Sequence, residues 1–277
     1  MSSYKLISSQ KEFFAHKAPS KYYLDRDELI KNPRNYKFNL KENGFVVIQN
    51  VFKKDYIDQI KDAYFNLFKG NFIRKEKNWI QISNPEIPHG CGDHPAKIFV
   101  KSKLFLEFIN NDILKEISKV LLSSKESVLT KRAIIRSFSK ISNSTTAAHR
   151  DREYYKSNDN SKVVTVWIPL GNADINHGQL IYLENSHKAF FKDRSELKGK
   201  QRIISYDLGD LANKTSKNWL IPKVNKGDVI FHCLNIVHAS FESNSNEPRL
   251  SCDLRFGTDL KYLDQRWNNY WYGDDGL

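Results

Sequence analysis

The chain has 277 residues, of which 40% are hydrophobic and 13% aromatic, a composition typical of a globular protein and unlike a disordered one. Its net charge of +12 at pH 7 is spread along the chain, so the sequence has no basic tail. The three cysteines form no CxxC pair, which argues against a disulfide framework and a cysteine-based zinc site. Because no apolar signal region or membrane-length apolar run is present, we expect a soluble cytoplasmic protein without membrane contact.

The first part of the chain, residues 1–127, predicts mainly helices. The apolar run at 44–48 predicts a short strand, and residues 55–68 then carry apolar side chains at helical spacing. The same spacing predicts further helix over 104–122. Residues 71–97 lie between these helices, contain Pro, Gly and His, and predict a long loop that is a candidate lid.

From residue 128 onward the pattern changes to short β-rich segments bounded by turn residues. These segments predict strands over 133–138, 163–170, 179–183, 219–224, 228–237 and 250–256. Such a succession of short strands is typical of a sandwich or jelly roll. No flexible linker interrupts the chain, so we expect one domain over 1–277. Its fold class would be mainly β with flanking helices, with a helical support layer over 1–127 and a jelly-roll core over 128–277.

Two short motifs carry side chains that suit a metal ion. His149 and Asp151 are two residues apart, so in an extended segment both side chains point the same way. By itself an H-x-D triplet is weak, because it occurs by chance in many surface loops. His238 ends the apolar segment predicted as a buried strand, where the alternative is a core histidine bonded to a backbone carbonyl. Together the three side chains would form a two-histidine, one-carboxylate set that suits non-haem iron(II).

A third motif follows His238 along the chain. Arg249 comes eleven residues later, after the turn-like segment 242–248, which predicts a hairpin whose second strand runs beside the one ending at His238. The planar guanidinium of arginine binds a carboxylate through two hydrogen bonds, so Arg249 is a candidate anchor for an anion near the metal. Ser240 could add a hydroxyl donor from the same face as His238.

These motifs, in this order, resemble the phytanoyl-CoA dioxygenase family of iron(II)/2-oxoglutarate oxygenases. The matching segments are His149-Arg150-Asp151, Trp167 within VVTVWIPL, then HGQLIYLENSHK, GDVIFHCLNIVHAS and Arg249, preceded by ENGFVVIQNVF near residue 45. Asn185 stands where the family usually has glycine. The resemblance runs from about residue 40 to the C-terminus and implies a double-stranded β-helix, a cupin-like jelly roll.

The resemblance also implies roles for individual residues. It implies that His149, Asp151 and His238 bind Fe(II), and that Arg249 and Ser240 hold the distal carboxylate of 2-oxoglutarate. Trp167 would line the cosubstrate pocket, with core packing as an equal alternative. The implied activity is that of a dioxygenase that uses O2 to hydroxylate a C–H bond and releases succinate and CO2. Because Asp151 supplies a carboxylate where halogenating relatives carry a small residue, hydroxylation is favoured over halogenation.

The substrate is less well determined by the sequence. Arg132 and Arg136 are four residues apart in a predicted strand and therefore share a face, whereas Arg150 points to the other side of its strand from the two ligands it separates. With the positive net charge, these arginines predict a small or medium-sized metabolite with an anionic group, and the alternative for each is solvated surface charge.

Two other function classes remain open at this point. One is a jelly-roll binding protein without catalysis, against which the intact ligand set argues. The other is a basic nucleic-acid-binding protein, against which argue the lack of a clustered basic stripe and of a recognition motif. We therefore expect a small-molecule substrate and no nucleic-acid partner.

Overall fold

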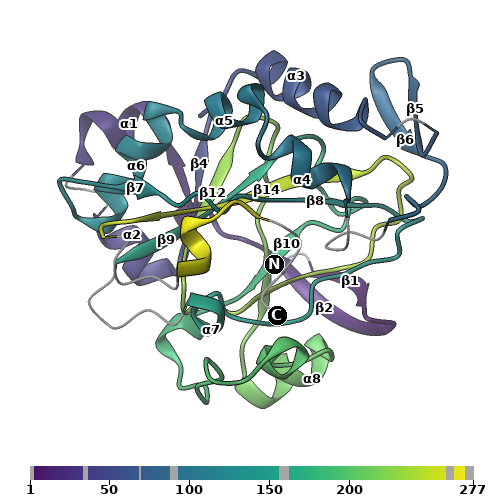
Figure 1. Cartoon of the computed structure of the whole chain (residues 1–277). Coiled ribbons are helices and arrows are strands. Elements are labelled where there is room, and N and C mark those ends of the chain that lie inside the picture. The colour runs from purple at the N-terminus through teal and green to yellow at the C-terminus, as the bar shows by residue number, and fades with distance from the viewer. Residues whose placement is uncertain are drawn as a thin grey trace.

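The computed structural model describes residues 3–33, 37–68, 70–87, 93–155, 162–259 and 265–271. Two large β-sheets form the body of the molecule, with most helices on one side and α8 on the other (Figure 1). This arrangement confirms the predicted jelly roll with flanking helices. None of the helices in the described ranges is both long and apolar enough to cross a membrane.

The larger sheet has seven strands in the order β3-β4-β12-β9-β14-β7, with β8 also paired to β14. Its strands are β3 (Tyr23–Asp25), β4 (Phe45–Gln49), β7 (Val128–Leu129), β8 (Ile134–Phe138), β9 (Val163–Pro169), β12 (Val229–Cys233) and β14 (Arg249–Gly257). The smaller sheet has five strands in the order β1-β2-β11-β10-β13. These are β1 (Ser3–Ser8), β2 (Lys11–Lys17), β10 (Leu180–Leu183), β11 (Trp219–Ile221) and β13 (His238–Ser240). A separate hairpin joins β5 (Phe72–Lys75) to β6 (Asn78–Gln81).

Eight α-helices occur in the described residues. They are α1 (Arg26–Lys31), α2 (Lys37–Asn43), α3 (Lys54–Phe65), α4 (Pro95–Phe99), α5 (Lys103–Ile109), α6 (Asp112–Leu122), α7 (Arg152–Tyr155) and α8 (Leu208–Thr215). A short 3-10 turn, η6 (Gln265–Asn268), follows β14.

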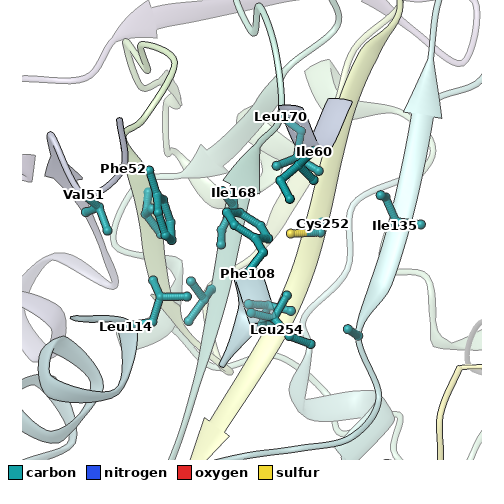
Figure 2. Packing of buried hydrophobic residues seen from close by; sticks show 14 of the residues in the cluster. Val51, Phe52, Ile60, Phe108, Leu114, Ile135, Ile168, Leu170, Cys252 and Leu254 are labelled. Carbon is teal, nitrogen blue, oxygen red and sulfur yellow. The ribbon is translucent and has the colours of Figure 1, made fainter. Parts of the chain in front are cut away.

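Strand β14 shows how the alternation of side chains builds the core and the site together. Every residue of β14 is buried, so both of its faces are covered. Cys252 and Leu254 pack with Ile168 of β9 against the helical layer, as Figure 2 shows beside Phe108 of α5. The alternate residues of β14, including Arg249, point the other way, into the space between the two sheets. Burial of this apolar face holds the helices in place and orients the polar face of β14 toward the barrel interior.

Two details of strand pairing differ from the prediction. The strand expected over 228–237 ends at Cys233, and after a turn His238 begins β13 in the other sheet. The hairpin expected between His238 and Arg249 is therefore wrong, because β14 pairs with β7, β8 and β9 and not with β13. The apolar run continues through Ile236 and Val237 because the turn itself is buried, so hydrophobicity does not mark the end of the strand.

The N-terminal part of the chain contains more strand than expected. Strand β4 corresponds to the strand expected at 44–48, but β1, β2 and β3 were not expected and also extend the two sheets. The segment 71–97, expected as a loop, contains the β5–β6 hairpin and the start of α4. Its residues 88–92 lie outside the described ranges, as does that part of the lid prediction. The helix expected over 104–122 is two helices, and the side chain of Asn111 caps the second by accepting a hydrogen bond from the backbone N–H of Ile113.

Candidate metal centre

His149 and His238 are brought together by the backbone itself. The N–H of each residue donates to the carbonyl of the other, at 3.1 and 3.0 Å, so the two histidines are directly opposed across an isolated β-bridge. Their ring centroids are 4.2 Å apart. Asp151 lies just before α7, and its carboxylate reaches the same point. One ligand atom from each of the three residues lies within 4.8 Å of the other two, a spacing that could hold a metal ion.

Both imidazoles are oriented by hydrogen bonds at the nitrogen that faces away from Asp151. The Nδ1 of His149 lies 2.9 Å from the carbonyl of Ala147, and that of His238 lies 3.1 Å from the carbonyl of Ile236. A carbonyl can only accept, so Nδ1 carries the proton in each ring and Nε2 presents a lone pair. These Nε2 atoms lie 3.9 and 3.8 Å from the same oxygen, Oδ1 of Asp151. The three donor atoms thus converge.

The second oxygen of Asp151 is held by protein donors. Oδ2 accepts hydrogen bonds from the Thr165 hydroxyl, from Nε2 of His232 at 3.3 Å and from Nη2 of Arg255 at 3.2 Å. Burial opposes ionisation of this carboxyl, but the Arg255 guanidinium and the bond from His232 keep its pKa well below the usual range. The carboxylate is therefore charged, with Oδ1 left for a cation.

Burial also sets the protonation of the two histidines. It lowers the pKa of His149, against the opposing effect of Asp151, and lowers the pKa of His238 further, with the neighbouring His149 adding to the effect. Neutral imidazoles are the form that binds a metal, so the site is prepared for ligation at neutral pH.

His232 also belongs to the site, although no motif in the sequence indicates it. Its Nδ1 lies 3.0 Å from the hydroxyl of Tyr182. Because its Nε2 must donate to the Asp151 carboxylate, Nδ1 is the acceptor and the Tyr182 hydroxyl donates to it. Strand alternation is the feature of the sequence that indicates its position. His232 follows Ile230 by two residues on β12, so both side chains lie on the face directed between the sheets.

Arg249 lies deep between the sheets with only 2% of its surface exposed. Its guanidinium carbon is 4.7 Å from the centroid of the Phe138 ring and 5.7 Å from that of Trp167. Burial lowers the pKa of Arg249 to about 9, and its Nε has no hydrogen-bond partner within the described part of the chain. A buried cation with an unused donor and aromatic walls suits a bound carboxylate. The Ser240 hydroxyl accepts from the backbone N–H of Thr146 at 2.8 Å and keeps its own proton to donate.

A cavity of about 620 Å³ opens onto the candidate metal ligands. His149, Asp151, Arg132 and Arg136 line it, together with Phe138, against which Arg249 stacks. His238, Arg249, Ser240 and Trp167 are buried and do not form its lining.

Arg150 is turned away from the cavity, as expected for a residue between two ligands. Its guanidinium pairs with Glu153 and lies 5.5 Å from the Phe191 ring centroid. These contacts account for its burial, and Arg150 is not among the residues that line the cavity.

Comparison with known proteins agrees with this architecture. No curated protein sequence matches the chain. Among solved structures, the epimerase SnoN from nogalamycin biosynthesis, described as non-heme and alpha-ketoglutarate-dependent, is 14% identical, with a TM-score of 0.58 over 82% of this chain and 83% of its own. The carbocyclase SnoK of the same biosynthesis, described in the same terms, is 19% identical, with a TM-score of 0.59 over 82% and 83%. EctD from S. alaskensis is 14% identical, with a TM-score of 0.62 over 99% and 90%.

Because these sequence identities are low, the structural matches support the fold only. The family is shown by a match of the sequence to a family model. The family model of phytanoyl-CoA dioxygenase (PhyH) matches residues 40–251, well over half of the chain and the whole interval from β4 through the two histidines to the start of β14. The chain belongs to the phytanoyl-CoA dioxygenase (PhyH) family.

Proposed function

We propose that the protein is an Fe(II)- and 2-oxoglutarate-dependent dioxygenase that hydroxylates a C–H bond of a small or medium-sized metabolite and releases succinate and CO2. The observation that carries this proposal is the convergence of two Nε2 atoms and one carboxylate oxygen on one point beside a cavity. Membership of the PhyH family supports it. So do the neighbours of similar fold, since EctD has been crystallised with bound Fe and with 2-oxoglutarate.

The residues present fit iron(II). Two neutral imidazoles and one carboxylate on one side leave the other coordination positions open, which is the arrangement used by non-haem iron oxygenases. When bound, iron with 2-oxoglutarate and O2 supplies the oxidative chemistry, and the protein supplies binding, orientation and exclusion of water. Here His149, Asp151 and His238 would hold the metal, and the buried donors on Oδ2 would leave Oδ1 of Asp151 to bind it.

The residues deeper in the barrel fit the cosubstrate. Arg249 would pair with the distal carboxylate of 2-oxoglutarate, and the Ser240 hydroxyl would add a donor. Trp167 would serve both of its expected roles, because it belongs to the core cluster between the sheets and its ring also faces the Arg249 guanidinium. The low exposure of Arg249 means that its charge is weakly screened there, so it would hold an anion strongly.

The outcome of the reaction is a separate question from the site. SnoN is an epimerase and SnoK a carbocyclase, so proteins of this fold reach different products. Asp151 keeps the third ligand position as a carboxylate, which favours hydroxylation or a related oxidation over halogenation, and of these outcomes we propose hydroxylation. Product identification with a substrate would distinguish hydroxylation from these alternatives.

Anaerobic addition of Fe(II) and then 2-oxoglutarate tests the proposal without knowledge of the substrate. We expect the visible charge-transfer absorption of an iron–2-oxoglutarate complex in the wild type, and its loss in His149→Ala and His238→Ala. His177→Ala is a matched control, because His177 is also a buried histidine but contacts Asp174 and Glu247 and none of the proposed ligands. Wild-type absorption or succinate production in either ligand variant would show the assignment to be wrong.

A further inference from the structure

The wall of the cavity has an excess of positive charge. Among the described residues that line it, the charged ones are four arginines, Arg132, Arg136, Arg255 and Arg266, and one acid, Asp151. Arg136 also pairs with Asp253 at 3.6 Å, an acid that does not line the cavity. Under the proposed function, the two positive charges of Fe(II) and the two negative charges of 2-oxoglutarate cancel, so arginines still outnumber acids on the cavity wall when both are bound. A surface of this sign attracts anions and disfavours cations.

Two of these arginines are organised around one aromatic ring. The guanidinium carbons of Arg132 and Arg255 lie 5.6 and 5.2 Å from the ring centroid of Trp267, in the 3-10 turn η6. Both arginines are nearly fully buried, at 2% and 5% exposure. Arg255 also donates to Asp151, so this cluster lies next to the proposed metal ligands. Arg266 also lines the cavity, and its Nη2 donates a hydrogen bond to the backbone carbonyl of Tyr154 at 3.3 Å.

Another part of the cavity wall is apolar and aromatic. Tyr64 of α3, Phe68 just beyond it and Phe72 of β5 all line the cavity and are nearly fully buried. Their rings are packed on one another, with centroids 5.0 Å apart for Tyr64 and Phe68 and 5.6 Å apart for Phe68 and Phe72. A rigid aromatic surface of this kind suits an apolar part of a ligand.

We infer that the cavity binds an amphipathic anion as the substrate. Its anionic group, a carboxylate, sulfonate or phosphate, is held by Arg132 and Arg266 beside Trp267, and its apolar body lies against Phe68 and Phe72. That the bound anion is the substrate rests on the proposed function. Its chemistry follows from the charge and the lining of the cavity. A cation would be repelled by this wall, and a wholly polar anion would leave the aromatic surface without a matching partner.

Two fluorescent probes that differ by one anionic group test this directly. 8-Anilinonaphthalene-1-sulfonate carries a sulfonate, and N-phenyl-1-naphthylamine is its neutral counterpart. Both would be titrated anaerobically into protein loaded with Fe(II) and saturating 2-oxoglutarate, so that the Arg249 site is already filled. We expect the sulfonate to bind about tenfold more tightly than the neutral probe, as for one charge-assisted contact.

Single substitutions then test the arginine wall and the aromatic wall of the cavity separately. Arg132→Gln and Arg266→Gln should each weaken the sulfonate by about tenfold, the size of one charge-assisted contact. Binding of the neutral probe should be unchanged. Phe72→Ala should weaken both probes. Arg26→Gln is the matched control, because it removes the same charge from an arginine on α1 that pairs with Asp27 and does not line the cavity. Arg266 is only half-buried, so its variant keeps the test decisive if Arg132→Gln fails to fold.

The outcomes distinguish this inference from the proposed function. Equal binding of the two probes by the wild type, or unchanged sulfonate binding in both arginine variants, would overturn the anion site, even if the charge-transfer absorption forms normally. Discrimination between the probes without any charge-transfer absorption would instead overturn the oxygenase proposal and leave an anion-binding cavity. Unchanged charge-transfer absorption in the arginine variants is the expected result, since it shows that the metal centre is intact.

Discussion

At the scale of single residues, the two oxygens of Asp151 have different surroundings. Oδ2 accepts from Thr165, His232 and Arg255, while Oδ1 faces the two histidine Nε2 atoms. Turning the carboxylate would break three buried hydrogen bonds at once, two of which come from groups that support its negative charge. The donors on Oδ2 would therefore leave Oδ1 as the oxygen available to a metal.

His232 provides a test of this arrangement. His232→Leu should lower Fe(II) affinity by about 10- to 100-fold, because partners that orient a ligand typically contribute that much. His232→Gln, whose amide can still donate to Asp151, should recover part of the loss. Tyr182→Phe is the control, since it removes the hydroxyl behind His232 and keeps the bond to Asp151. Anaerobic calorimetric titration measures the affinities, and wild-type affinity in His232→Leu would refute the positioning role.

Arg249 provides a second test at this scale. Arg249→Ala should weaken 2-oxoglutarate binding by about 2–5 kcal/mol, because a buried anion would lose its charged partner. Fe(II) affinity should change little, since Arg249 contacts aromatic rings and none of the three proposed ligands. Titration of 2-oxoglutarate into the iron-loaded variant, followed by the charge-transfer absorption, measures the effect. An unchanged dissociation constant would mean that the distal carboxylate is bound elsewhere.

At the scale of elements, the sequence predicts strands well where their length and composition are distinctive. Segments such as 163–170 and 250–256 were expected as strands and correspond to β9 and β14. No local pattern indicates the β1–β2 hairpin, because the N-terminal segment carries many polar residues and because β2 is stabilised by pairing with the distant β11. The end of β12 was misplaced because apolar residues fill both the strand and the following turn. In these cases tertiary burial, which local patterns do not encode, decides the boundary.

The break between α5 and α6 has a local cause that a stability measurement can test. Asn110 and Asn111 end one helix and begin the next, and the Asn111 side chain accepts from the Ile113 N–H at 2.9 Å. Asn111→Ala should lower the free energy of unfolding by about 1 kcal/mol, the usual effect of losing an N-cap. Asn111→Asp should retain the stability, because aspartate caps as well as asparagine does. Chemical denaturation of the three proteins measures the difference, and equal stability of Asn111→Ala would show that packing alone defines α6.

At the scale of the whole molecule, the site forms where the two sheets meet. The residues His149, Asp151 and His238 could be proposed from spacing and family resemblance, because their motifs are compact in the sequence. The contacts of Asp151 with His232 and Arg255 span 81 and 104 residues, and they exist only because β12, β9 and β14 are adjacent. Sequence patterns indicate which segments are strands but not their order in a sheet. The groups that orient the proposed ligands were therefore visible only in the structure.

This placement predicts that a metal ion stabilises the fold. His238 belongs to the five-stranded sheet, whereas Asp151 is held by donors on three strands of the seven-stranded sheet. An ion bound to both would link the sheets, and an ion that binds only the folded protein at 100 times its dissociation constant adds about 2.7 kcal/mol. Mn(II), which resists oxidation in air, should therefore raise the melting temperature of the wild type and leave that of His149→Ala unchanged.

The pH dependence of this stabilisation follows from the lowered pKa values of His149 and His238. In the unfolded chain both histidines take up protons near their ordinary pKa of about 6.5. In the folded protein they resist protonation to lower pH. The metal-free protein should therefore lose stability as pH falls from about 6.5 toward the folded pKa values, with a shallower loss in His149→Ala. Protons compete with Mn(II) in the folded state only at those lower values, so the increase in melting temperature should persist through pH 6.5 and disappear on further acidification. Melting curves from pH 8 to 5, with and without Mn(II), measure both effects, and an increment that grows with acidification would contradict ligation by these histidines.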